Sequence, residues 1–327
     1  MPKFEKLLVT GASGQLGRRL IKELLGKNYR IRAHYRSEEK ASRYCPEGVE
    51  KVLGDITNPD WLDKAVSGCD LVIHCAAKVS VRPLNKRDTE YMYKVNVEGT
   101  RAVVDSCLRG GVKRLIHVSS IAAVAASTDG TPVDETAKFN LGGFDLPYFD
   151  TKHEAEQIAL AATGESLEVV SVNPSIMVSL PDRQMSEKDR NKIPKRIPVY
   201  FNFGLNLVYT QDVIEGIIAA IDKGRPGERY LLTGENFNPK RAFALAKEYF
   251  GIKKPYLKVP LFCFYLAGAL AEVIYVFRHK KPKLNRKIAR LLKYKLYYSH
   301  EKASQELGFK PKDLEGIVQE IVRYLKS

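Results

Sequence analysis

The eight residues "TGASGQLG", Thr10–Gly17, decide the fold of this 327-residue chain. A short apolar run, Leu7–Thr10, leads into them, and an amphipathic stretch, Leu16–Leu25, follows. A glycine-rich turn between a strand and a helix is typical of a dinucleotide-binding βαβ unit. Free backbone N–H groups and the helix dipole favour an anion at such a helix N-terminus. We therefore expect a phosphate-binding turn at this point of the chain.

The three glycines of the turn have distinct physical roles. Gly11 permits the tight change of direction, Gly14 lets the backbone approach a pyrophosphate, and Gly17 lets the helix pack closely on the strand. A glycine turn with a purely structural role is the alternative. The residues of the turn that we expect to contact a dinucleotide are Gly11, Ser13, Gly14, Gln15, Leu16 and Gly17.

Short β-branched runs alternate with helical patterns along the first half of the chain. This alternation predicts a parallel sheet that helices cover on both faces, with right-handed crossovers. The expected fold class is α/β, a Rossmann doubly wound parallel sheet with a smaller, mainly helical C-terminal substrate lobe. The expected strands are Leu7–Thr10, Ile31–Tyr35, Val49–Leu53, Leu71–His74, Arg114–Val118 and Val169–Asn173.

The regular alternation ends after Pro174, which sets the expected domain boundary. We expect residues 1–174 to form the NAD(P)-binding Rossmann domain. Residues 175–327 are expected to form the substrate-binding lobe, interleaved with the Rossmann sheet around residues 205–235.

Three segments of the second half have patterns of their own. The polar, proline-punctuated stretch Leu180–Pro198 predicts a loop or lid, and Asp212–Asp222 predicts a helix with Asp212 as its N-cap. The most apolar stretch is Val259–Phe277, which only Glu272 interrupts. It is too short and too charged to span a membrane, so a core helix is the favoured interpretation. Docking of this helix on a membrane surface is the alternative.

The composition is that of a folded globular protein with a basic C-terminal part. Hydrophobic residues make up 44% and charged residues 28%, which excludes disorder as the main state. The formal net charge is +15, and residues 278–312 hold twelve Lys/Arg against two glutamates. A solvated basic face is favoured over contact with phosphates, an anionic membrane or nucleic acid. Because the stretch lacks a recognised reading module, we expect no nucleic-acid partner.

The cysteines indicate reduced thiols. The chain has five, an odd number, and they form no C-x-x-C pair, which argues against a zinc site and against a disulfide framework. We therefore expect no metal. No signal-peptide pattern opens the chain. The expected localisation is cytoplasmic, with peripheral membrane association as a subsidiary hypothesis.

The end of the second expected strand carries the evidence on the type of dinucleotide. Arg36 stands where NAD-preferring folds usually carry an acidic residue, and an arginine suits a 2′-phosphate. NADP is therefore the expected cofactor, with NAD as the alternative. Arg43 or Lys40 could join Arg36, whereas the neighbouring acidic pair Glu38–Glu39 argues against the assignment.

After the third expected strand, Asp55 and Ile56 are expected at the adenine end of the cofactor. A helix cap is an equally good interpretation of Asp55.

The stretch "PYFDTK", Pro147–Lys152, places Tyr148 and Lys152 four residues apart. On a helix this spacing puts both side chains on one face. A phenol has a reference pKa of roughly 10, so it is a poor base near neutrality unless a cation stabilises the phenolate. We therefore expect Tyr148 and Lys152 to form an acid/base couple.

Taken together, these motifs resemble the extended short-chain dehydrogenase/reductase superfamily, and within it the dihydroflavonol-reductase and 3β-hydroxysteroid-dehydrogenase-like branch. The resemblance covers about the first 175 residues and continues more loosely beyond them. The motifs are "TGASGQLG" at Thr10–Gly17, "GDI" at Gly54–Ile56, "HCAA" at His74–Ala77, "NVEGT" at Asn96–Thr100, "VSS" at Val118–Ser120 and "YFDTK" at Tyr148–Lys152.

The resemblance implies roles for several residues. Tyr148 would exchange a proton with the reacting oxygen, and Lys152 would bind the nicotinamide ribose and lower the pKa of the tyrosine. Ser120, favoured over Ser119, would polarise a carbonyl, and Asn96 would support the geometry. The resemblance adds Cys75, Ala76, Ala77, Pro174 and Ile176 to the cofactor-binding residues, together with Tyr148 and Lys152 themselves.

The leading functional hypothesis is an NADP(H)-dependent oxidoreductase that acts on a ketone or a secondary alcohol, including lipophilic ones. A sugar-nucleotide epimerase or dehydratase is the alternative, although Asn173-Pro174 is not followed by the tyrosine-glycine-proline turn usual in those enzymes. A dinucleotide-binding sensor without activity is a third hypothesis. The resemblance also implies a homodimer through the helices that begin near Arg87 and Tyr148.

Overall fold

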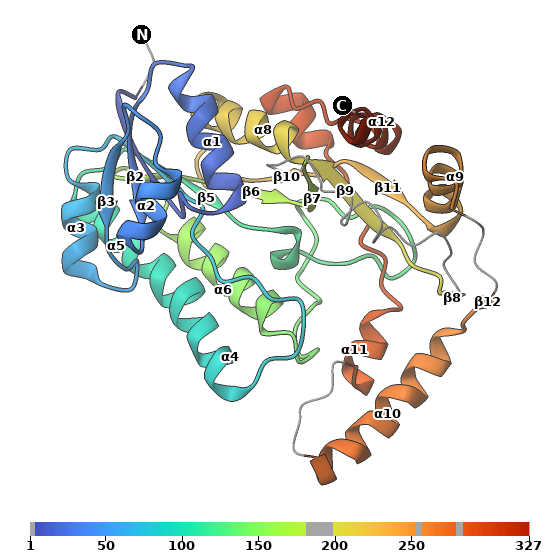
Figure 1. Ribbon diagram of the computed structural model, residues 1–327. Coiled ribbons are helices and arrows are strands. Elements are labelled where there is room, and N and C mark those ends of the chain that lie inside the picture. The colour runs from blue at the N-terminus through green and yellow to red at the C-terminus, as the bar shows by residue number, and fades with distance from the viewer. Residues whose placement is uncertain (1–3, 181–198, 253–256, 279–283, 327) are drawn as a thin grey trace.

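The computed structural model describes residues 4–180, 199–252, 257–278 and 284–326. A seven-stranded parallel sheet in the order β10-β6-β5-β4-β1-β2-β3 forms the centre of the molecule (Figure 1). The sequence-predicted α/β Rossmann class is thereby confirmed. The strands of this sheet are β1 (Lys6–Thr10), β2 (Arg30–Tyr35), β3 (Glu50–Leu53), β4 (Leu71–His74), β5 (Arg114–Val118), β6 (Glu168–Pro174) and β10 (Arg229–Leu232).

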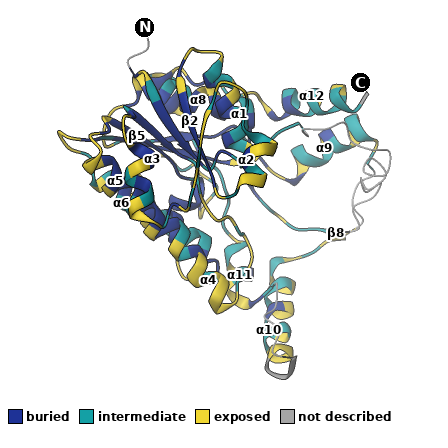
Figure 2. Ribbon diagram, turned by 60° about the vertical axis from the view of Figure 1, so that its left-hand side comes forward, coloured by how far each residue is buried: buried dark blue, intermediate teal, exposed yellow. Residues whose placement is uncertain are grey.

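Helices cover both faces of the sheet, because its strands are apolar on both sides. One apolar cluster joins the sheet to α1 (Gln15–Leu25), α2 (Glu38–Tyr44) and α8 (Thr210–Lys223). A second cluster joins the other face to α3 (Pro59–Val66), α5 (Gly99–Arg109) and α6 (Pro147–Ala161). Figure 2 shows the strands as the most deeply buried part of the chain. The helices α4 (Lys86–Tyr93) and η1 (Lys94–Glu98) precede α5, and the short helix η2 (Ile121–Ala123) follows β5.

The strand order places β1 between β2 and β4, which is the point where the winding of the sheet reverses. In such sheets the carboxyl ends of the strands at the reversal form a crevice for ligands. The glycine turn follows β1 directly, so the fold brings it to this crevice.

Side-chain caps define where several helices begin, and they correct one alternative. Ser37, Asn58 and Asn85 accept hydrogen bonds from backbone N–H groups in the first turns of α2, α3 and α4. The interpretation of Asp55 as a helix cap is wrong, because Asn58 caps α3. Asp55 instead accepts hydrogen bonds of 2.9 Å from the N–H and the hydroxyl of Thr57.

The second half of the chain returns to the sheet once, through α8 and β10, and otherwise builds smaller sheets. Strands β7 (Ile176–Val178), β9 (Leu205–Tyr209) and β11 (Glu235–Phe237) form one of them, and β8 (Val199–Tyr200) pairs with β12 (Leu257–Lys258). The remaining helices in the described part of the chain are α9 (Pro239–Phe250), α10 (Leu261–Arg278), α11 (Arg286–Leu291), η3 (Ala303–Leu307) and α12 (Leu314–Lys326).

The predicted helix and the predicted loop of this half have different outcomes. The helix around residues 212–222 exists, but it begins at Thr210, so Asp212 is not its N-cap. Asp212 lies in the first turn and accepts a hydrogen bond of 2.7 Å from the N–H of Lys312, which ties α8 to the segment before α12. Residues 181–198 of the predicted loop or lid lie outside the described residues.

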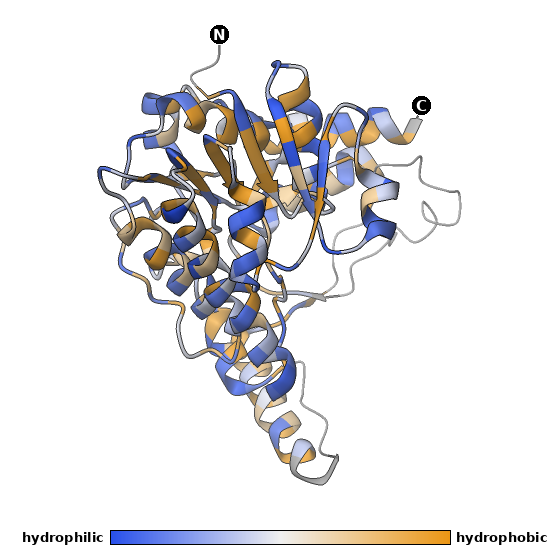
Figure 3. Cartoon of the chain, turned by 90° about the vertical axis from the view of Figure 1, so that its left-hand side faces the viewer, coloured by the Kyte–Doolittle hydropathy of each residue, from blue (hydrophilic) through white to orange (hydrophobic). Residues whose placement is uncertain are grey.

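The favoured interpretation of the apolar stretch as a core helix is wrong. Helix α10 projects from the body of the molecule (Figures 1 and 3). Phe262 is 65% exposed and Leu270 62% exposed, and Leu266, Val273 and Ile274 are exposed as well. Of its described side-chain positions only Gly268 is buried, where the backbone of Asn285 crosses it closely. Among the residues that the structure describes, no helix has the length and apolarity required to cross a membrane.

Candidate active site

The glycine turn has the close packing that its spacing predicts. Gly11 adopts φ +72°, and a Cβ there would lie 2.8 Å from the backbone nitrogen of Ala76. A Cβ on Gly17 would lie 2.5 Å from the carbonyl oxygen of Gly11. The first position therefore needs glycine for its left-handed backbone and for the approach of the β4 loop, and the third needs it for helix packing.

Gly14 forms the extended N-cap residue of α1, and no described side chain caps this helix. The N–H groups of the first turn of a helix have no partner within the helix. They are therefore left for a ligand at the carboxyl end of β1. By contrast, the side chain of Gln15 is hydrogen-bonded to Ser179, and Leu16 packs against the core.

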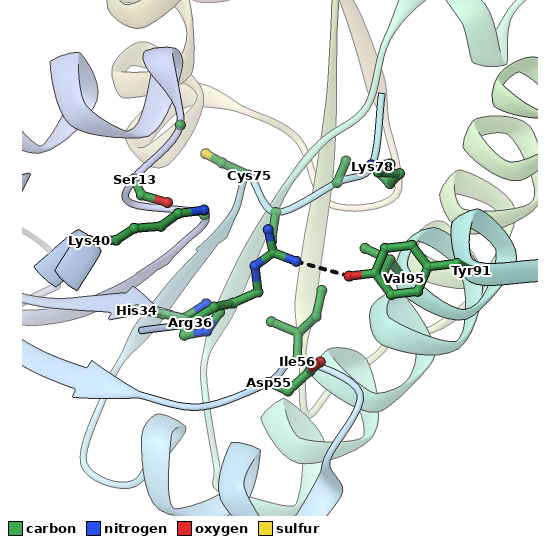
Figure 4. Close-up of a pocket in the computed structure, with 14 residues that line it drawn as sticks. Ser13, His34, Arg36, Lys40, Asp55, Ile56, Cys75, Lys78, Tyr91 and Val95 are labelled. Carbon is green, nitrogen blue, oxygen red and sulfur yellow. Dashed lines mark hydrogen bonds between the residues drawn. The ribbon is translucent and has the colours of Figure 1, made fainter. Parts of the chain in front are cut away.

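A cavity of about 300 Å³ lies beside this turn (Figure 4). It extends from the turn across the carboxyl ends of β2 and β4 to helix α4. Its lining residues are Gly11, Ser13, Gly14, His34, Arg36, Lys40, Asp55, Ile56, Cys75, Ala76, Ala77, Lys78, Tyr91 and Val95. Of the sequence-predicted cofactor residues, the lining does not include Gln15, Leu16, Gly17, Arg43, Tyr148, Lys152, Pro174 and Ile176.

Three cations line the cavity. Arg36 donates a hydrogen bond of 2.9 Å to the hydroxyl of Tyr91, and the ammonium of Lys78 lies 5.8 Å from the centre of the same ring. Lys40 reaches toward the cavity from α2 (Figure 4). Of the two alternatives offered by the sequence, Lys40 therefore lines the cavity, whereas Arg43 stacks over the ring of Tyr44 at 5.1 Å.

The acidic pair that follows Arg36 does not oppose this arrangement. Glu38 and Glu39 lie in the first turn of α2, where negative charge favours the helix. Glu38 forms an ion pair with Lys51, and neither glutamate lines the cavity.

One carboxylate, Asp55, and one imidazole, His34, also line the cavity. Burial opposes ionisation of Asp55, but the hydrogen bonds from Thr57 and the guanidinium of Arg36 hold its pKa below the ordinary value. The Nε2–H of His34 donates a hydrogen bond of 2.9 Å to the carbonyl oxygen of Gly54. Burial is the largest cause that lowers the pKa of His34, which keeps the ring uncharged at neutral pH.

These residues fit a dinucleotide. The uncapped turn supplies N–H donors for a pyrophosphate, and Asp55 can accept from an amine or a hydroxyl group. Arg36, Lys40 and Lys78 offer three cations within one cavity, which suits a further phosphate.

The predicted catalytic residues gather at the carboxyl end of β5. Pro147 occupies the first turn of α6, a position that suits its fixed φ, and Tyr148 follows it. The hydroxyl of Tyr148 is hydrogen-bonded to the side chain of Ser120. Ser120 directly follows β5 and also accepts a hydrogen bond of 3.2 Å from the N–H of Ala122, which caps η2. Ser119 is buried, and its hydroxyl has no partner among the described residues.

The ionisation of Tyr148 differs from the sequence-based expectation. Burial is the larger effect and raises the pKa of Tyr148, whereas the hydrogen bond with Ser120 acts in the opposite direction. The phenol therefore holds its proton at neutral pH.

Lys152 lies one turn further along α6, deep in the protein. It is 3% exposed, and its ammonium donates a hydrogen bond of 3.0 Å to the carbonyl oxygen of Val118. Burial lowers the pKa of Lys152 to about 8. Cys75, which lines the cavity, is among the groups that act on the pKa of Lys152.

Asn96 acts on the backbone around the site. It is buried on η1, where its carbonyl oxygen accepts from the N–H of Lys78 at 2.7 Å. Its amide nitrogen donates to the carbonyl oxygen of Lys78 at 3.0 Å and to the hydroxyl of Thr151 at 3.1 Å. Asn96 thus fixes the loop after β4 against α6, between the cavity and Tyr148.

Two further predicted residues lie on the other side of β5. Pro174 is buried at the end of β6, next to β5 in the sheet. Ile176 begins β7 and is 40% exposed.

The sequence reasoning did not identify His34, Lys78, Tyr91 and Val95 as residues of the cavity. His34 had a readable signal, because it precedes Arg36 by two residues and so points to the same side of β2. The other three reach the cavity from the loop after β4, from α4 and from η1, and their approach depends on how these elements pack.

The parallel sheet, the uncapped glycine turn and the Ser120–Tyr148–Lys152 constellation define an NAD(P)-dependent enzyme of the extended short-chain dehydrogenase/reductase type. Residues 7–233 match the NAD dependent epimerase/dehydratase family, and the chain belongs to this family. The predicted family resemblance and the predicted NAD(P)-dependent enzyme class are thereby confirmed.

Relatives of known name are similar over nearly the whole chain. A 4-hydroxy-2-methyl-3-oxo-4-farnesyl-3,4-dihydroquinoline-1-oxide ketoreductase from Stigmatella aurantiaca is 31% identical, with 93% of this chain and 91% of the relative covered. A 3-beta-hydroxysteroid dehydrogenase from Mycolicibacterium neoaurum is 28% identical, with 94% and 87% covered. The crystal structure of gox2253 is 30% identical, with a TM-score of 0.81 and 98% of each chain covered.

Proposed function

We propose that this chain is an NADP(H)-dependent oxidoreductase that transfers a hydride between nicotinamide and a ketone or secondary alcohol. The observation that carries the proposal is the placement of Ser120 and Tyr148 at the carboxyl end of β5, one helical turn from the buried ammonium of Lys152. This constellation lies at the carboxyl end of β5, next to β4, and Cys75 directly after β4 lines the dinucleotide cavity.

In the proposed reduction, the hydroxyl of Tyr148 donates its proton to the substrate oxygen, and Ser120 donates a hydrogen bond to the same oxygen. The ammonium of Lys152 lowers the free energy of the phenolate that remains. When bound, the nicotinamide supplies or accepts the hydride. Because burial raises the pKa of Tyr148, this side chain is protonated at neutral pH and is the acid that carbonyl reduction requires.

We propose NADP rather than NAD as the cofactor. The support comes from Arg36 and Lys40, two cations of the cavity that could bind the negative charge added by a 2′-phosphate. Asp55 would accept from the adenine amine, and the first turn of α1 would hold the pyrophosphate. Arg43, Pro174 and Ile176 remain proposed contacts of the cofactor outside this cavity.

We propose a lipophilic carbonyl compound as the substrate. Relatives named for a farnesyl quinoline oxide and for a steroid act on large apolar molecules, which supports this class. The region after residue 174 is the proposed substrate lobe, residues 175–327, interleaved with the sheet around residues 205–235.

A screen of aromatic, steroid-like and nucleotide-sugar ketones, with absorbance of NADPH and NADH followed separately, tests the function. Net oxidation of NADPH by a carbonyl compound supports it, and Tyr148→Phe should lower kcat at least 100-fold with unchanged NADPH binding. Near-native turnover of Tyr148→Phe would refute the mechanism. Turnover of a nucleotide sugar without net nucleotide change would favour the epimerase alternative instead.

We also propose peripheral contact of α10 with an anionic membrane. The outward positions Phe262, Leu266, Leu270, Val273 and Ile274 are exposed and apolar. Exposed basic residues at Lys258, Arg286, Lys287, Arg290 and Lys293 accompany them in the described residues, against Glu272, which pairs with Arg286. Apolar insertion together with nearby cations is the combination that binds anionic lipid reversibly.

Two proposals concern the surroundings of the protein in the cell. All five cysteines carry free thiols, which supports a reducing, cytoplasmic compartment. Homodimerisation through α4 and α6, which lie side by side, is a further proposal that light scattering can measure.

A further inference from the structure

A buried carboxylate, Glu156, lies one helical turn beyond Lys152 on α6 and is 0% exposed. One of its oxygens lies 3.3 Å from the guanidinium of Arg229 on β10. The other accepts a hydrogen bond of 3.0 Å from the hydroxyl of Ser171 and another from the amide of Asn173, both on β6. A carboxylate removed from water in this way requires compensation, and here the neighbouring strands supply it.

The same network reaches the proposed catalytic residues. The amide nitrogen of Asn173 that donates to Glu156 also donates to the carbonyl oxygen of Ser120 at 3.0 Å. The side chain of Ser120 in turn is hydrogen-bonded to Tyr148. The position of the Ser120 backbone therefore depends on Asn173, and Asn173 is oriented by Glu156.

Glu156 is also a charged group one helical turn from Lys152 on α6, and its carboxylate favours the charged form of this ammonium. The other titratable side chains around this ammonium are His74 on β4, Cys75 after it and His117 on β5. Burial lowers the pKa of His74 to about 3 and that of His117 as well, and it raises the pKa of Cys75 to about 12, so all three are neutral near pH 7. Tyr148, one turn earlier on α6, also keeps its proton.

We propose that Glu156 is a positioning residue of the reaction, which fixes Ser120 through Asn173 and keeps the ammonium of Lys152 charged inside the protein. The inference deepens the proposed function and rests on it for its catalytic meaning. The geometry itself, a buried carboxylate between Arg229, Asn173 and the lysine of the same helix, is independent of the substrate.

Direct titration of Lys152 tests the electrostatic part without any substrate. The protein is labelled with ¹³C at lysine Cε, and the Lys152 resonance is assigned by its loss in Lys152→Met. NMR spectra recorded across a range of pH then give the titration midpoint of Lys152. Glu156→Gln keeps an acceptor for Asn173 but removes the charge, so the midpoint should move to lower pH by about one unit or more. In Glu156→Asp, which retains the charge, the titration midpoint of Lys152 should lie closer to the wild-type value.

Steady-state kinetics test the consequence for the reaction, with NADPH and 9,10-phenanthrenequinone as the carbonyl probe. If ammonium is the active form, activity falls as pH rises through the Lys152 midpoint. Glu156→Gln should therefore move the alkaline limb of kcat to lower pH, with unchanged KM for NADPH at pH 6. Asn173→Ala should lower kcat about tenfold, because it removes the hydrogen bond to the carbonyl oxygen of Ser120. It should leave the alkaline limb of kcat at the wild-type pH, because it removes no charge.

Glu168→Gln is the matched control. Glu168 forms an ion pair with the buried Arg114, also between neighbouring strands. Because Glu168 is the first residue of β6, it lies at the amino end of this strand, whereas Asn173 lies near the carboxyl end. Its variant should leave both the Lys152 midpoint and the pH profile unchanged. A Glu156→Gln protein with the wild-type midpoint would overturn the inference, as would an equal shift in Glu168→Gln. Failure of the wild type to oxidise NADPH with every carbonyl compound would instead refute the proposed function, while the NMR midpoints still decide the role of Glu156.

Discussion

The ammonium of Lys152 donates a hydrogen bond of 3.0 Å to the carbonyl oxygen of Val118, the last residue of β5. This contact ties the helix that carries Tyr148 to the strand that leads into Ser120. It also shows that the lysine lies inside the protein, where its charge has lost most of its hydration. Because a buried charge loses its hydration, Lys152 is expected to lower the free energy of unfolding of the protein even though it supports catalysis.

Lys152→Met should therefore increase stability while it abolishes turnover. The folded pKa of about 8 lies below the ordinary value of 10.5, so the unfolded chain binds more protons between these pH values. The cost of the buried charge is full below pH 8 and disappears as pH rises above 10.5. The difference corresponds to about 3 kcal/mol, which is the upper limit of the gain at pH 7 because the bond to Val118 is lost.

Urea unfolding of both proteins at pH 7 and at pH 10 measures this effect. The variant should be the more stable protein at pH 7, and its advantage should shrink at pH 10. Lys113→Met, at a lysine whose side chain is 69% exposed, should change stability by less than about 0.5 kcal/mol. A Lys152→Met protein that is less stable than the wild type at pH 7 would contradict the prediction.

The glycine turn allows a comparison of two substitutions with the same backbone cost. Gly11 and Gly111 both have positive φ, +72° and +68°, so alanine is strained at either position by roughly 1–2 kcal/mol. At Gly111 a Cβ meets nothing within 4 Å, whereas at Gly11 it would lie 2.8 Å from the nitrogen of Ala76. Gly11→Ala should therefore cost roughly 1–3 kcal/mol more in the free energy of unfolding.

Thermal unfolding and NADPH fluorescence titration check this pair. Gly111→Ala should bind NADPH as the wild type does, and Gly11→Ala should bind it at least tenfold more weakly. Equal stability and equal affinity of the two variants would mean that the turn is looser than the structure shows.

The parallel sheet could be predicted from sequence because each strand is a short apolar run between turn residues. The predicted bounds of β4 and β5 agree with the structure, and those of β2 and β3 differ by one residue at the start. The glycine turn and the Tyr148–Lys152 spacing were readable for the same reason, since both depend only on neighbours in the sequence.

Features that depend on packing could not be read in this way. Hydropathy makes α10 a core helix, but how much of it other elements cover is decided by the tertiary fold, which leaves Phe262, Leu266 and Leu270 exposed. Tyr91 meets Arg36, and Lys78 lies over the ring of Tyr91, only because α4 packs beside the cavity. Glu156 had a readable signal, because it continues the spacing of four from Tyr148 and Lys152 along one helix face.

Arg36 should determine the preference for NADPH. Arg36→Leu removes a charge-assisted hydrogen bond to a 2′-phosphate, worth roughly 1.5–3 kcal/mol, and should raise the KM for NADPH about 10- to 150-fold. The KM for NADH should change little, because the unphosphorylated ribose has no such partner. Arg43→Leu should raise the KM for NADPH far less than Arg36→Leu does, since Arg43 stacks on Tyr44 and does not line the cavity. An equal loss for both cofactors in Arg36→Leu would contradict the role proposed for this residue.

Helix α10 should bind membranes through its apolar face and the nearby cations together. Leu266 is 51% exposed and Leu270 62% exposed, so Leu266→Lys with Leu270→Lys should leave the unfolding transition unchanged. Each leucine that enters lipid contributes roughly 1.5–3 kcal/mol when fully buried, so the double variant should bind vesicles at least tenfold more weakly.

The lipid composition of the vesicles separates the two contributions. Wild-type protein should co-sediment with phosphatidylcholine vesicles that contain phosphatidylserine and far less with pure phosphatidylcholine, and added salt should weaken the binding. Reversal of charge at Arg290 and Lys293 to glutamate should remove this preference, at about 1 kcal/mol or more for each cation. Val81→Lys, an exposed apolar residue far from α10 in the sequence, should have no effect. Equal binding to both kinds of vesicle, or wild-type binding by the leucine variant, would show that α10 is not a membrane contact, and its apolar face would then have to be covered by another protein surface.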